Sequence, residues 1–500
     1  MKITPVLIGL MTLLSYTSLS AQVERRVAII GGGISGLTTA YELQTQGVPV
    51  KYEIFEGGER VGGRIRNVEN VKGTGLYLNA GAELVDSNHD NLIKLVRDLD
   101  IDLQSRIIPG RPQGTQFFMS NKVYNSEEEF LAELFKKHGK KIQKLSTDQK
   151  NLADSRKGLV SGKFSAQELA MDKLTMEKYF EKIGVEGDLL SYLKTGIESE
   201  FGAPLDKLSA LNLFDAYEFD PKKQTIHFLP SNDELYRIKG GTQQIIDKLS
   251  EKVGSKVKLE HQLISIESVD NKIYHLKFRT PEGIVTKTFD DVVMTLPLKA
   301  VQNVELNIKN FPEKMRKAIK EVSYAENSKL SLLFDQRVWN DLGHSGNGIS
   351  HLGFQVWDSS LNQTDVKQGS LTAYMGHHKE LKEIGPEKMS KKILAQLEQA
   401  YPGISKHYIG HHFETWPLSY SGAYRPGEMT KLEVDSKSIG NLHWAGETFG
   451  ESKGYMNGAV QSAQKAVLSI GKKSSIQKSC IQTALKQLEN LSISPATAFP

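Results

Sequence analysis

The sequence predicts an α/β fold in which two domains are interleaved along the chain. Residues 27–30 form a short, fully apolar run with glycines directly behind it, as expected of a central strand in a parallel sheet. A helical pattern follows, and residues 50–55 form a second strand, so that the chain opens with a βαβ unit. From residue 126 to 214 the sequence is charged, leucine-punctuated and poor in glycine and proline, which predicts a helical insertion.

The composition is that of a globular protein with a large core. Of the 500 residues, 39% are hydrophobic and 24% are charged, which excludes fibrous and wholly disordered chains. The 63 basic and 59 acidic residues give a formal charge of +4 that is spread along the chain, so nucleic acid is not an expected partner. The sole cysteine, Cys480, excludes an intrachain disulfide.

Residues 1–21 are typical of a secretory signal peptide. Lys2 is followed by an apolar run over residues 3–14 and then by small and polar residues, with cleavage expected after Ser20 or Ala21. The run is shorter than the roughly 20 residues that cross a membrane, and no other stretch is apolar for long enough. We therefore expect an exported protein, periplasmic or secreted, with no membrane span in the mature chain. An anchoring or frayed N-terminal segment is the alternative.

The later elements alternate between helices and strands. Gly240, Gly241 and Thr242 open a helix that continues through Leu249. We expect strands over residues 257–259, 263–269, 273–278, 285–295, 330–334 and 442–445, and helices over residues 391–400 and 455–469. The lysine-rich tail over residues 471–500 has leucines at helical spacing, but its composition favours a loosely docked or disordered terminus.

A glycine fingerprint opens the first helix. Gly31, Gly33 and Gly36 satisfy the pattern G-x-G-x-x-G between an apolar strand and a helix, which is the context of a Rossmann-type dinucleotide site. Such glycines allow a tight turn, close approach of the backbone to a pyrophosphate, and close packing of the helix on the strand. Glu56 ends the second strand, where a carboxylate can accept both hydroxyls of an adenosine ribose.

A second glycine pair lies between Arg60 and Arg64, in the segment R-V-G-G-R. With this segment the sequence resembles the flavin-containing amine oxidase family, whose first motif joins the glycine fingerprint to E-x-x-x-R-V-G-G-R. It lacks the C-terminal membrane helix of mitochondrial monoamine oxidases and looks more like the soluble bacterial members. The resemblance continues at residues 79–83, 239–242, 291–297, 444–448 and 454–460, and so covers about residues 25 to 470.

The resemblance implies an FAD cofactor that is held along these motifs. In the family, the segment around Glu447 places a second helix N-terminus beneath the flavin, with the glutamate near the pyrophosphate. A flavin accepts a hydride at N5, so few acid or base side chains are then needed. Besides the three glycines and Glu56, the residues assigned to FAD are Ile34, Ser35, Arg60, Gly63, Arg64, Gly81, Ala82, Glu83, Leu84, Leu263, Trp416, Gly446, Glu447, Gly454, Tyr455 and Met456.

Three residues carry the catalytic roles that the resemblance implies. Lys329 matches the family lysine that reaches flavin N5 through a water and is thought to assist reoxidation by O2. Tyr424 and Tyr455 match the two aromatic positions that flank the substrate amine in monoamine oxidases. A solvated strand lysine and two ordinary core tyrosines are the alternatives.

Several positions depart from the family pattern. Ala423 stands where monoamine oxidases carry the cysteine that links FAD covalently, and Cys480 lies in the tail, so non-covalent FAD is expected. Asn79 replaces the usual aspartate and Gly57-Gly58 replaces a bulkier pair, which predicts looser contacts with the adenosine. No metal site is expected, because the neighbouring histidines fit an ordinary strand better than a ligand set; they are His407, His411 and His412.

The motifs divide the chain into two discontinuous domains. An FAD-binding domain of the Rossmann type is expected over residues 24–115, 232–300 and 417–470. An α+β substrate domain, with the helical insertion, is expected over residues 116–231 and 301–416.

The function that this resemblance implies is oxidation of a small amine. The amine would give a hydride to flavin N5 and become an imine, which then yields aldehyde and ammonia, while O2 is reduced to hydrogen peroxide. The alternatives are an L-amino-acid oxidase on the same fold, a carotenoid or porphyrin desaturase, and a non-catalytic flavin-binding protein. A homodimer is a further possibility.

Overall fold

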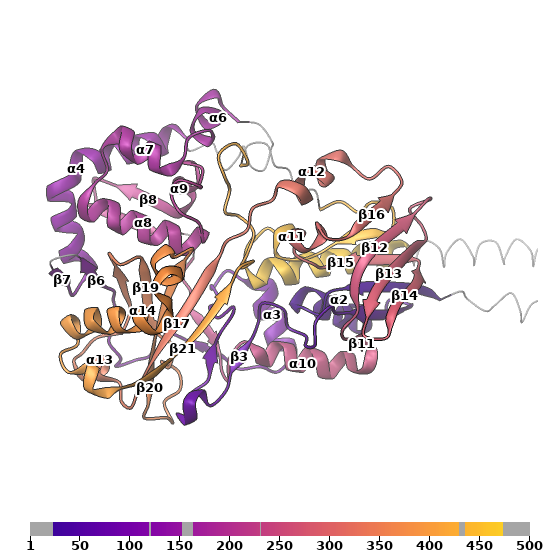
Figure 1. Ribbon diagram of the computed structural model, residues 1–500, viewed down its shortest axis with the longest axis horizontal. Helices are drawn as coiled ribbons and strands as arrows, with labels where there is room; N and C mark the ends of the chain where they lie inside the picture. The colour runs from indigo at the N-terminus through magenta and orange to yellow at the C-terminus, as the bar shows by residue number, and fades with distance from the viewer. Residues whose placement is uncertain (1–23, 120–121, 153–163, 231, 430–435, 474–500) are drawn as a thin grey trace, which may run out of the picture.

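The computed structural model describes residues 24–119, 122–152, 164–230, 232–429 and 436–473. The predicted signal peptide and Cys480 lie outside these ranges. The described chain forms two bodies that lie side by side, one around a parallel sheet and one around a larger, mostly antiparallel sheet (Figure 1). Over the described ranges, no helix is both long and apolar enough to cross a membrane.

A five-stranded parallel sheet is the centre of the first body. Its central strand β1 pairs with β2 on one side and with β15 on the other, and residue Val27 is aligned with Tyr52 and Asp291. Strands that are far apart in the sequence thus meet in one sheet. In spatial order they are β11 (Val257–Lys258), β2 (Val50–Phe55), β1 (Arg25–Ile30), β15 (Asp291–Met294) and β22 (Leu442–Trp444).

The residues of β1 alternate between two cores, one on each face of the sheet. Val27 and Ile29 pack among helices α2 (Ile34–Thr45), α3 (Asp90–Asp98), α10 (Gln243–Val253) and the helix over residues 456–473. Ala28 and Ile30 pack on the other face with a four-stranded sheet and with α11 (Leu298–Val301) and α12 (Glu313–Glu321). Because both faces are covered, residues 27–30 of β1 and residues 292–294 of β15 are continuous apolar runs, and the predicted α/β class is confirmed.

The four-stranded sheet corrects one predicted element. The single strand predicted over residues 285–295 is wrong, because this segment forms two strands of different sheets, which divide at Asp290. The first is partly exposed and pairs with its neighbour in antiparallel register, whereas all of β15 is buried. The sheet has the order β14 (Gly283–Phe289), β13 (Tyr274–Thr280), β12 (Gln262–Ser268) and β16 (Glu305–Ile308).

A seven-stranded sheet is the centre of the second body. Its strand β17 lies between β20 and β21, and all eight of its residues are buried. Helix α14 (Lys379–Ala400) packs against one face and is broken at Gly385, so the helix predicted over residues 391–400 is its second half. In order, the strands are β21 (Tyr408–Trp416), β17 (Asn327–Phe334), β20 (Gly369–Gly376), β19 (Phe354–Asp358), β18 (Gly348–Ser350), β6 (Gln116–Met119) and β7 (Lys122–Tyr124).

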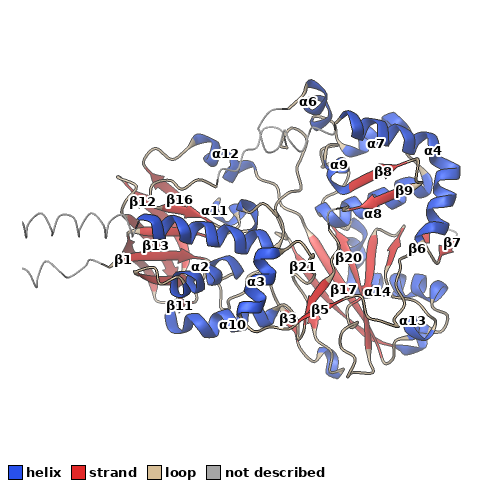
Figure 2. Ribbon diagram, turned by 180° about the vertical axis from the view of Figure 1, so that it is seen from behind, coloured by secondary structure: helices blue, strands red, loops and turns tan. Residues whose placement is uncertain are grey.

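The predicted helical insertion covers the other side of this sheet (Figure 2). Helix α8 packs across β18, β19 and β20, and the helices share a core with Phe117 and Ile349 of the sheet. Ser126 caps the first helix by accepting a hydrogen bond from the Glu129 N–H. The helices are α4 (Glu127–Asn151), α6 (Ala166–Asp172), α7 (Met176–Ile183), α8 (Gly187–Phe201) and α9 (Asn212–Ala216).

Short elements complete the described chain. Three two-stranded pairs are β3 (Asn67–Val68) with β4 (Leu78–Asn79), β5 (Leu103–Ser105) with β10 (Tyr236–Ile238), and β8 (Tyr217–Asp220) with β9 (Thr225–Phe228). The short helix α13 is Val338–Asp341.

Candidate active site

The first glycine turn lies at the carboxyl end of β1. Gly31 has a φ of +109°, and the turn leads into α2, whose N-cap is Gly33. A Cβ on Gly36 would lie 2.0 Å from the Gly31 carbonyl oxygen, whereas a Cβ on Gly33 would meet no atom within 4 Å. Gly36 therefore allows the helix to pack on the strand, and Gly33 leaves open space beside the helix N-terminus. Ile34 and Ser35 form the buried first turn, where the Ser35 hydroxyl has no partner.

Glu56 follows β2 and faces the same turn. Its Oε2 accepts a hydrogen bond of 2.7 Å from the Gly32 N–H, and its Oε1 accepts one of 2.8 Å from the Gly58 N–H. Each carboxylate oxygen keeps a further lone pair, so the group can still accept ribose hydroxyls. Gly58 thus helps to orient Glu56. It belongs to the Gly57-Gly58 pair, from which the sequence predicted looser contacts with the adenosine.

The second glycine loop lies against the first. The Gly62 N–H donates to the Gly32 carbonyl at 2.8 Å, and a Cβ on Gly63 would lie 3.7 Å from the Gly33 Cα. The Arg60 guanidinium donates to three carbonyls of its own loop, those of Val61, Gly63 and Ile65. Arg60 therefore closes the loop, which keeps the two glycine turns together.

Arg64 and Glu447 link an early and a late segment of the chain within the first body. Arg64 Nη1 donates to Glu447 Oε1 at 3.1 Å and to the Ser419 carbonyl at 2.8 Å. The other oxygen of this buried glutamate accepts from the Gly454 N–H at 3.1 Å, immediately before the helix over residues 456–473. Glu447 thus fixes the start of that helix, and the positive φ of Gly446 and Gly454 allows the bends on either side.

The segment over residues 80–84, after β4, contacts both bodies. A Cβ on Gly81 would lie 2.0 Å from the Arg64 carbonyl oxygen, and the Ala82 N–H donates to the same oxygen at 3.1 Å. Trp416, at the end of β21, donates from Nε1 to the Ala80 carbonyl at 2.8 Å. Of the other predicted residues, Leu84 is half-buried in this segment, Leu263 is a core residue of β12, and Met456 is a core residue of the last helix.

Lys329 lies at the centre of a buried polar network on β17. Its ammonium donates to the carbonyls of Asn79 and Gly81, both at 2.9 Å, and to Glu83 Oε2 at 2.7 Å. Arg237 Nη2 lies 3.1 Å from the other oxygen of Glu83. Burial favours a raised pKa for Glu83, but Lys329 and Arg237 outweigh it and lower the pKa. Glu83 is therefore a carboxylate that contacts two cations. The sequence had assigned it only to FAD, in the matching segment at residues 79–83.

Tyr455 lies among groups that titrate. Its hydroxyl is hydrogen-bonded to Asn232 and to Glu200 of α8, and its ring centroid is 5.2 Å from that of His89. Burial lowers the pKa of His89 to about 4, so the imidazole is neutral at pH 7. Burial raises the pKa of Glu200 to about 8, and the charges of Glu234 and Asp86 add to this shift.

The predicted partner of Tyr455, Tyr424, and a second tyrosine, Tyr420, lie on the same segment and make different contacts. Tyr424 packs against the core of the helical insertion, and its carbonyl accepts hydrogen bonds from Ser209 and Asn212. A Cβ on Gly454 would lie 3.2 Å from the Tyr420 ring, four residues earlier in the chain. Burial and the neighbouring Glu200 raise the pKa of Tyr420. Tyr420 is therefore the tyrosine that contacts Gly454, the residue before Tyr455, and the role predicted for Tyr424 stays a prediction.

A cavity of about 650 Å³ reaches this network from the helical insertion. Its walls include Tyr192 of α8 and Phe228 of β9. Two of its lining residues belong to the networks described above: Asn232 bonds to Tyr455, and Trp357 Nε1 donates to Glu83 at 3.2 Å. The lining of the cavity thus includes one hydrogen-bond partner of Tyr455 and one of Glu83, the carboxylate that contacts Lys329.

The acidic and basic residues of this cavity were not found from the sequence. It is lined by the carboxyl groups of Glu127, Glu218 and Glu234, and by Arg106, which pairs with Glu234 at 3.3 Å. These residues come from four separate segments and share no local pattern. The charged composition of the helical insertion was the only feature of the sequence that could have pointed to these residues.

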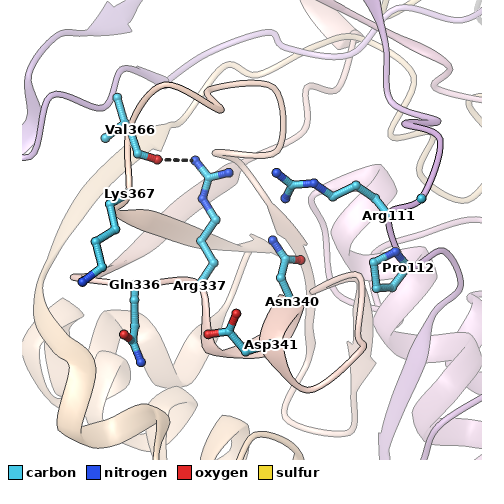
Figure 3. A pocket seen from close by; sticks show the side chains of 9 residues that line it. Arg111, Pro112, Gln336, Arg337, Asn340, Asp341, Val366 and Lys367 are labelled. Carbon is cyan, nitrogen blue, oxygen red and sulfur yellow. Dashed lines mark hydrogen bonds between the residues drawn. The ribbon is translucent and has the colours of Figure 1, made fainter.

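A second cavity, of about 390 Å³, lies beside α13 and has a different lining (Figure 3). Arg337 donates there to the carbonyls of Gln363 and Val366, and so it holds a loop of the chain. None of its lining residues has a predicted role. Within the described ranges, no group of three or more His, Cys, Asp or Glu side chains could hold a metal ion.

Asn79 has a structural role at the start of a helix. Its Oδ1 accepts hydrogen bonds from the N–H of Thr242 at 2.8 Å and from the hydroxyl of Thr242 at 3.1 Å. Thr242 is the N-cap of α10, so Asn79 satisfies a free N–H at a helix start. The substitution of aspartate by asparagine therefore affects this helix start.

The raised pKa of Glu200 predicts a pH-dependent stability effect. Because the pKa in the folded protein, about 8, exceeds the ordinary 4.5, protonation of Glu200 stabilises the fold below about pH 4.5. This stabilisation is lost as the pH rises to about 8. We expect Glu200→Gln to raise the free energy of unfolding by about 2–4 kcal/mol at pH 9 and to change it little at pH 5.

Denaturant unfolding of both proteins across this pH range tests the effect. Glu186→Gln is the matched control, because Glu186 pairs with Lys141 at the surface and its pKa is lowered by that contact. A difference between Glu200→Gln and wild type that does not vary with pH would contradict the assignment.

The residues of the first body fit a dinucleotide. The open space at Gly33, the unpartnered Ser35 hydroxyl and the helix N-terminus suit a pyrophosphate, and Glu56 suits a ribose. The fold and site therefore define a dinucleotide-binding oxidoreductase. Residues 34–470 match the family described as flavin containing amine oxidoreductase, and the chain belongs to this family.

Known proteins of similar sequence and structure agree with this family. A putative L-amino-acid oxidase, YobN, of Bacillus subtilis is 21% identical over 91% of this chain and 96% of its own length. A flavin-containing amine oxidase of Oncorhynchus mykiss is 23% identical over 90% and 86%. Cyclohexylamine oxidase from Brevibacterium oxydans has a similar fold, with a TM-score of 0.75, 19% identity, and coverage of 90% of this chain and 99% of that one.

Proposed function

We propose that this protein oxidises a small amine with FAD and O2. The observation that carries the proposal is the cavity whose lining includes one hydrogen-bond partner of Tyr455 and one of Glu83. Its lining carries three glutamates, which attract a cationic amine as it approaches. Family membership supplies the flavin, and the two glycine turns and Glu56 support a dinucleotide form of it, FAD.

The FAD is proposed to be bound without a covalent link. Ala423 is buried next to Gly422 and offers no thiol at the position where the resemblance places one. Acid precipitation of the purified protein should leave the yellow colour in the supernatant. A yellow pellet would refute non-covalent binding.

In the proposed reaction, the protein orients the amine and excludes water. When bound, the flavin supplies a two-electron acceptor at N5. Tyr455 and Tyr420 present ring surfaces that steer the neutral amine, and the neutral His89 adds no positive charge beside it. The α-carbon loses a hydride and the nitrogen loses a proton, so that C–N becomes C=N. Water then converts the imine to aldehyde and ammonia, and O2 takes up two electrons and two protons to form hydrogen peroxide.

An L-amino-acid oxidase is the second candidate, and Arg106 is the observation that favours it. This arginine lines the cavity, and its Nε is buried without a hydrogen-bond partner. A substrate carboxylate could pair with such a cation. However, Arg106 already pairs with Glu234, and burial together with nearby Arg237 lowers its pKa. The excess of glutamates in the lining makes an amine without a carboxylate the better substrate.

A peroxide assay across monoamines, diamines and L-amino acids tests the proposal. We expect turnover of simple amines, with amino acids at least about 10-fold slower, because a carboxylate must enter a cavity rich in glutamate. Turnover of amino acids alone would establish the second candidate. A flavin-loaded protein that oxidises neither class and reoxidises slowly in air would instead be a binding protein.

A further inference from the structure

Glu83 is the only charged acceptor of the Lys329 ammonium among its three hydrogen-bond partners. The other two are the carbonyl oxygens of Asn79 and Gly81. A lysine ammonium has three N–H groups, so all of them are used by the chain itself. The ammonium is therefore held in one place, and it has no N–H free for another acceptor unless one of these bonds opens.

Glu83 is held as firmly as the lysine. It is 5% exposed, and its Oε1 accepts from Trp357 Nε1 at 3.2 Å. Arg237 Nη2 lies 3.1 Å from the same oxygen, although no N–H of this nitrogen points along a hydrogen bond, so this contact is electrostatic. One carboxylate thus holds two cations, and the buried unit of Glu83, Lys329 and Arg237 carries a net positive charge.

The other groups around Lys329 do not replace Glu83. Its neighbours in the sheet register are Tyr374 on β20 and Glu414 on β21. Glu414 pairs with Arg66 instead, and burial keeps Tyr374 uncharged by raising its pKa. The Trp357 ring lies 5.5 Å from the Lys329 ammonium, and Arg106 adds positive charge near Glu83. Among the described residues, Glu83 is thus the carboxylate that bonds directly to the Lys329 ammonium.

We propose that Glu83 is a positioning residue that holds Lys329 as a permanent ammonium, which acts as a fixed positive charge during flavin reoxidation. This rests on the proposed role of Lys329 in the oxygen reaction. Electron transfer to O2 builds up negative charge on oxygen, and a fixed cation in a buried site stabilises that charge without reorganisation. A lysine that instead exchanged protons in each cycle would need a free N–H, and its effect would change with pH near neutrality.

The experiment follows the reoxidation of dithionite-reduced holoenzyme in air-saturated buffer from pH 6 to 10. We expect a rate that is flat from pH 6 to 9 in wild type. In Glu83→Gln, Lys329 loses its counter-charge and gives up its proton at lower pH, so the rate should fall about 10-fold between pH 6 and pH 9. Glu83→Asp should restore the flat profile at least in part, because it keeps the carboxylate. No amine is needed, so failure of the amine assay leaves this test intact.

A second measurement does not depend on activity. Labelling with acetic anhydride across the same pH range, followed by mass spectrometry, reports when Lys329 becomes an uncharged nucleophile. In Glu83→Gln, Lys329 should label at lower pH than in wild type. The matched control is Glu326→Gln, which removes a carboxylate three residues before Lys329 that pairs with Lys382 at the surface, and it should match wild type in both measurements.

Two results would overturn the proposal. The first is a flavin-loaded Glu83→Gln protein with the wild-type pH profile and the wild-type labelling of Lys329. If that variant does not retain flavin, the double variant Glu83→Gln with Lys329→Met removes both charges of the pair and is compared with Lys329→Met alone. If Glu83 acts only through Lys329, the double variant and Lys329→Met reoxidise at equal rates. The second overturning result is a double variant that reoxidises more than about 5-fold more slowly than Lys329→Met.

Discussion

Replacing Gly36 with alanine is expected to remove the flavin and to destabilise the protein by about 3 kcal/mol. The added Cβ would lie 2.0 Å from the Gly31 carbonyl oxygen, which is backbone and cannot move aside as a flexible side chain can. Helix α2 must then shift away from β1, and its N-terminus no longer faces the pyrophosphate position. The ratio of flavin to protein absorbance after purification measures the first effect, and denaturant unfolding measures the second.

Gly139→Ala is the matched control for this substitution. Gly139 lies within α4, and a Cβ there would meet no atom within 4 Å. Alanine should therefore leave flavin content unchanged and stabilise the helix by about 0.5–1 kcal/mol. Full flavin content in Gly36→Ala would show that the first glycine turn is not the cofactor site.

Replacing Lys329 with methionine is expected to slow reoxidation of the reduced flavin by O2 about 10²-fold. The substitution removes the ammonium but keeps a side chain of similar length, so that the space on β17 stays filled. Anaerobic reduction by substrate should change little, because the two electrons leave the amine before oxygen reacts. Stopped-flow measurement of the two half-reactions separates these effects.

Lys382→Met controls for the loss of a lysine in general. Lys382 is half-exposed on α14 and pairs with Glu326, so its removal should cost no more than about 1 kcal/mol and leave both half-reactions unchanged. An oxygen reaction of wild-type rate in Lys329→Met would remove the role assigned to this lysine, and with it the basis for the role of Glu83.

The dinucleotide-binding part could be predicted from sequence because its determinants are local. Gly31 has a positive φ and Gly36 packs against the Gly31 carbonyl, so both constraints act within six residues of chain, and the apolar run before them is buried on both faces. Lys329 was found through the resemblance, which implies a lysine at this position, and the structure places it on the buried strand β17. The other residues of its network, such as Arg237 and Trp357, could not be predicted. They lie on strands that come close to Lys329 only in the complete fold.

The tyrosines near Gly454 show what sequence spacing cannot decide. Tyr420 and Tyr424 lie four residues apart in a segment with few regular elements, and each is preceded by small residues. Sequence spacing alone cannot tell which ring turns towards Gly454, because the path of an irregular segment is set by contacts such as those of Arg64 and Glu447. Glu200 escaped notice for a related reason, since its chemistry arises from burial beside Tyr455 and not from any motif.

The order of strands in the parallel sheet has a consequence for how the protein reaches its folded state. The strand next to β1 on one side is β15, and β22 completes that edge only at residues 442–444. The glycine turn near the start of the chain therefore cannot gain its full surroundings until more than four hundred further residues have been synthesised. Long-range pairing of this kind forms slowly and leaves apolar strand edges uncovered in the meantime. The strand order therefore predicts that the parallel sheet around the glycine turn is completed only after residues 442–444 have joined it.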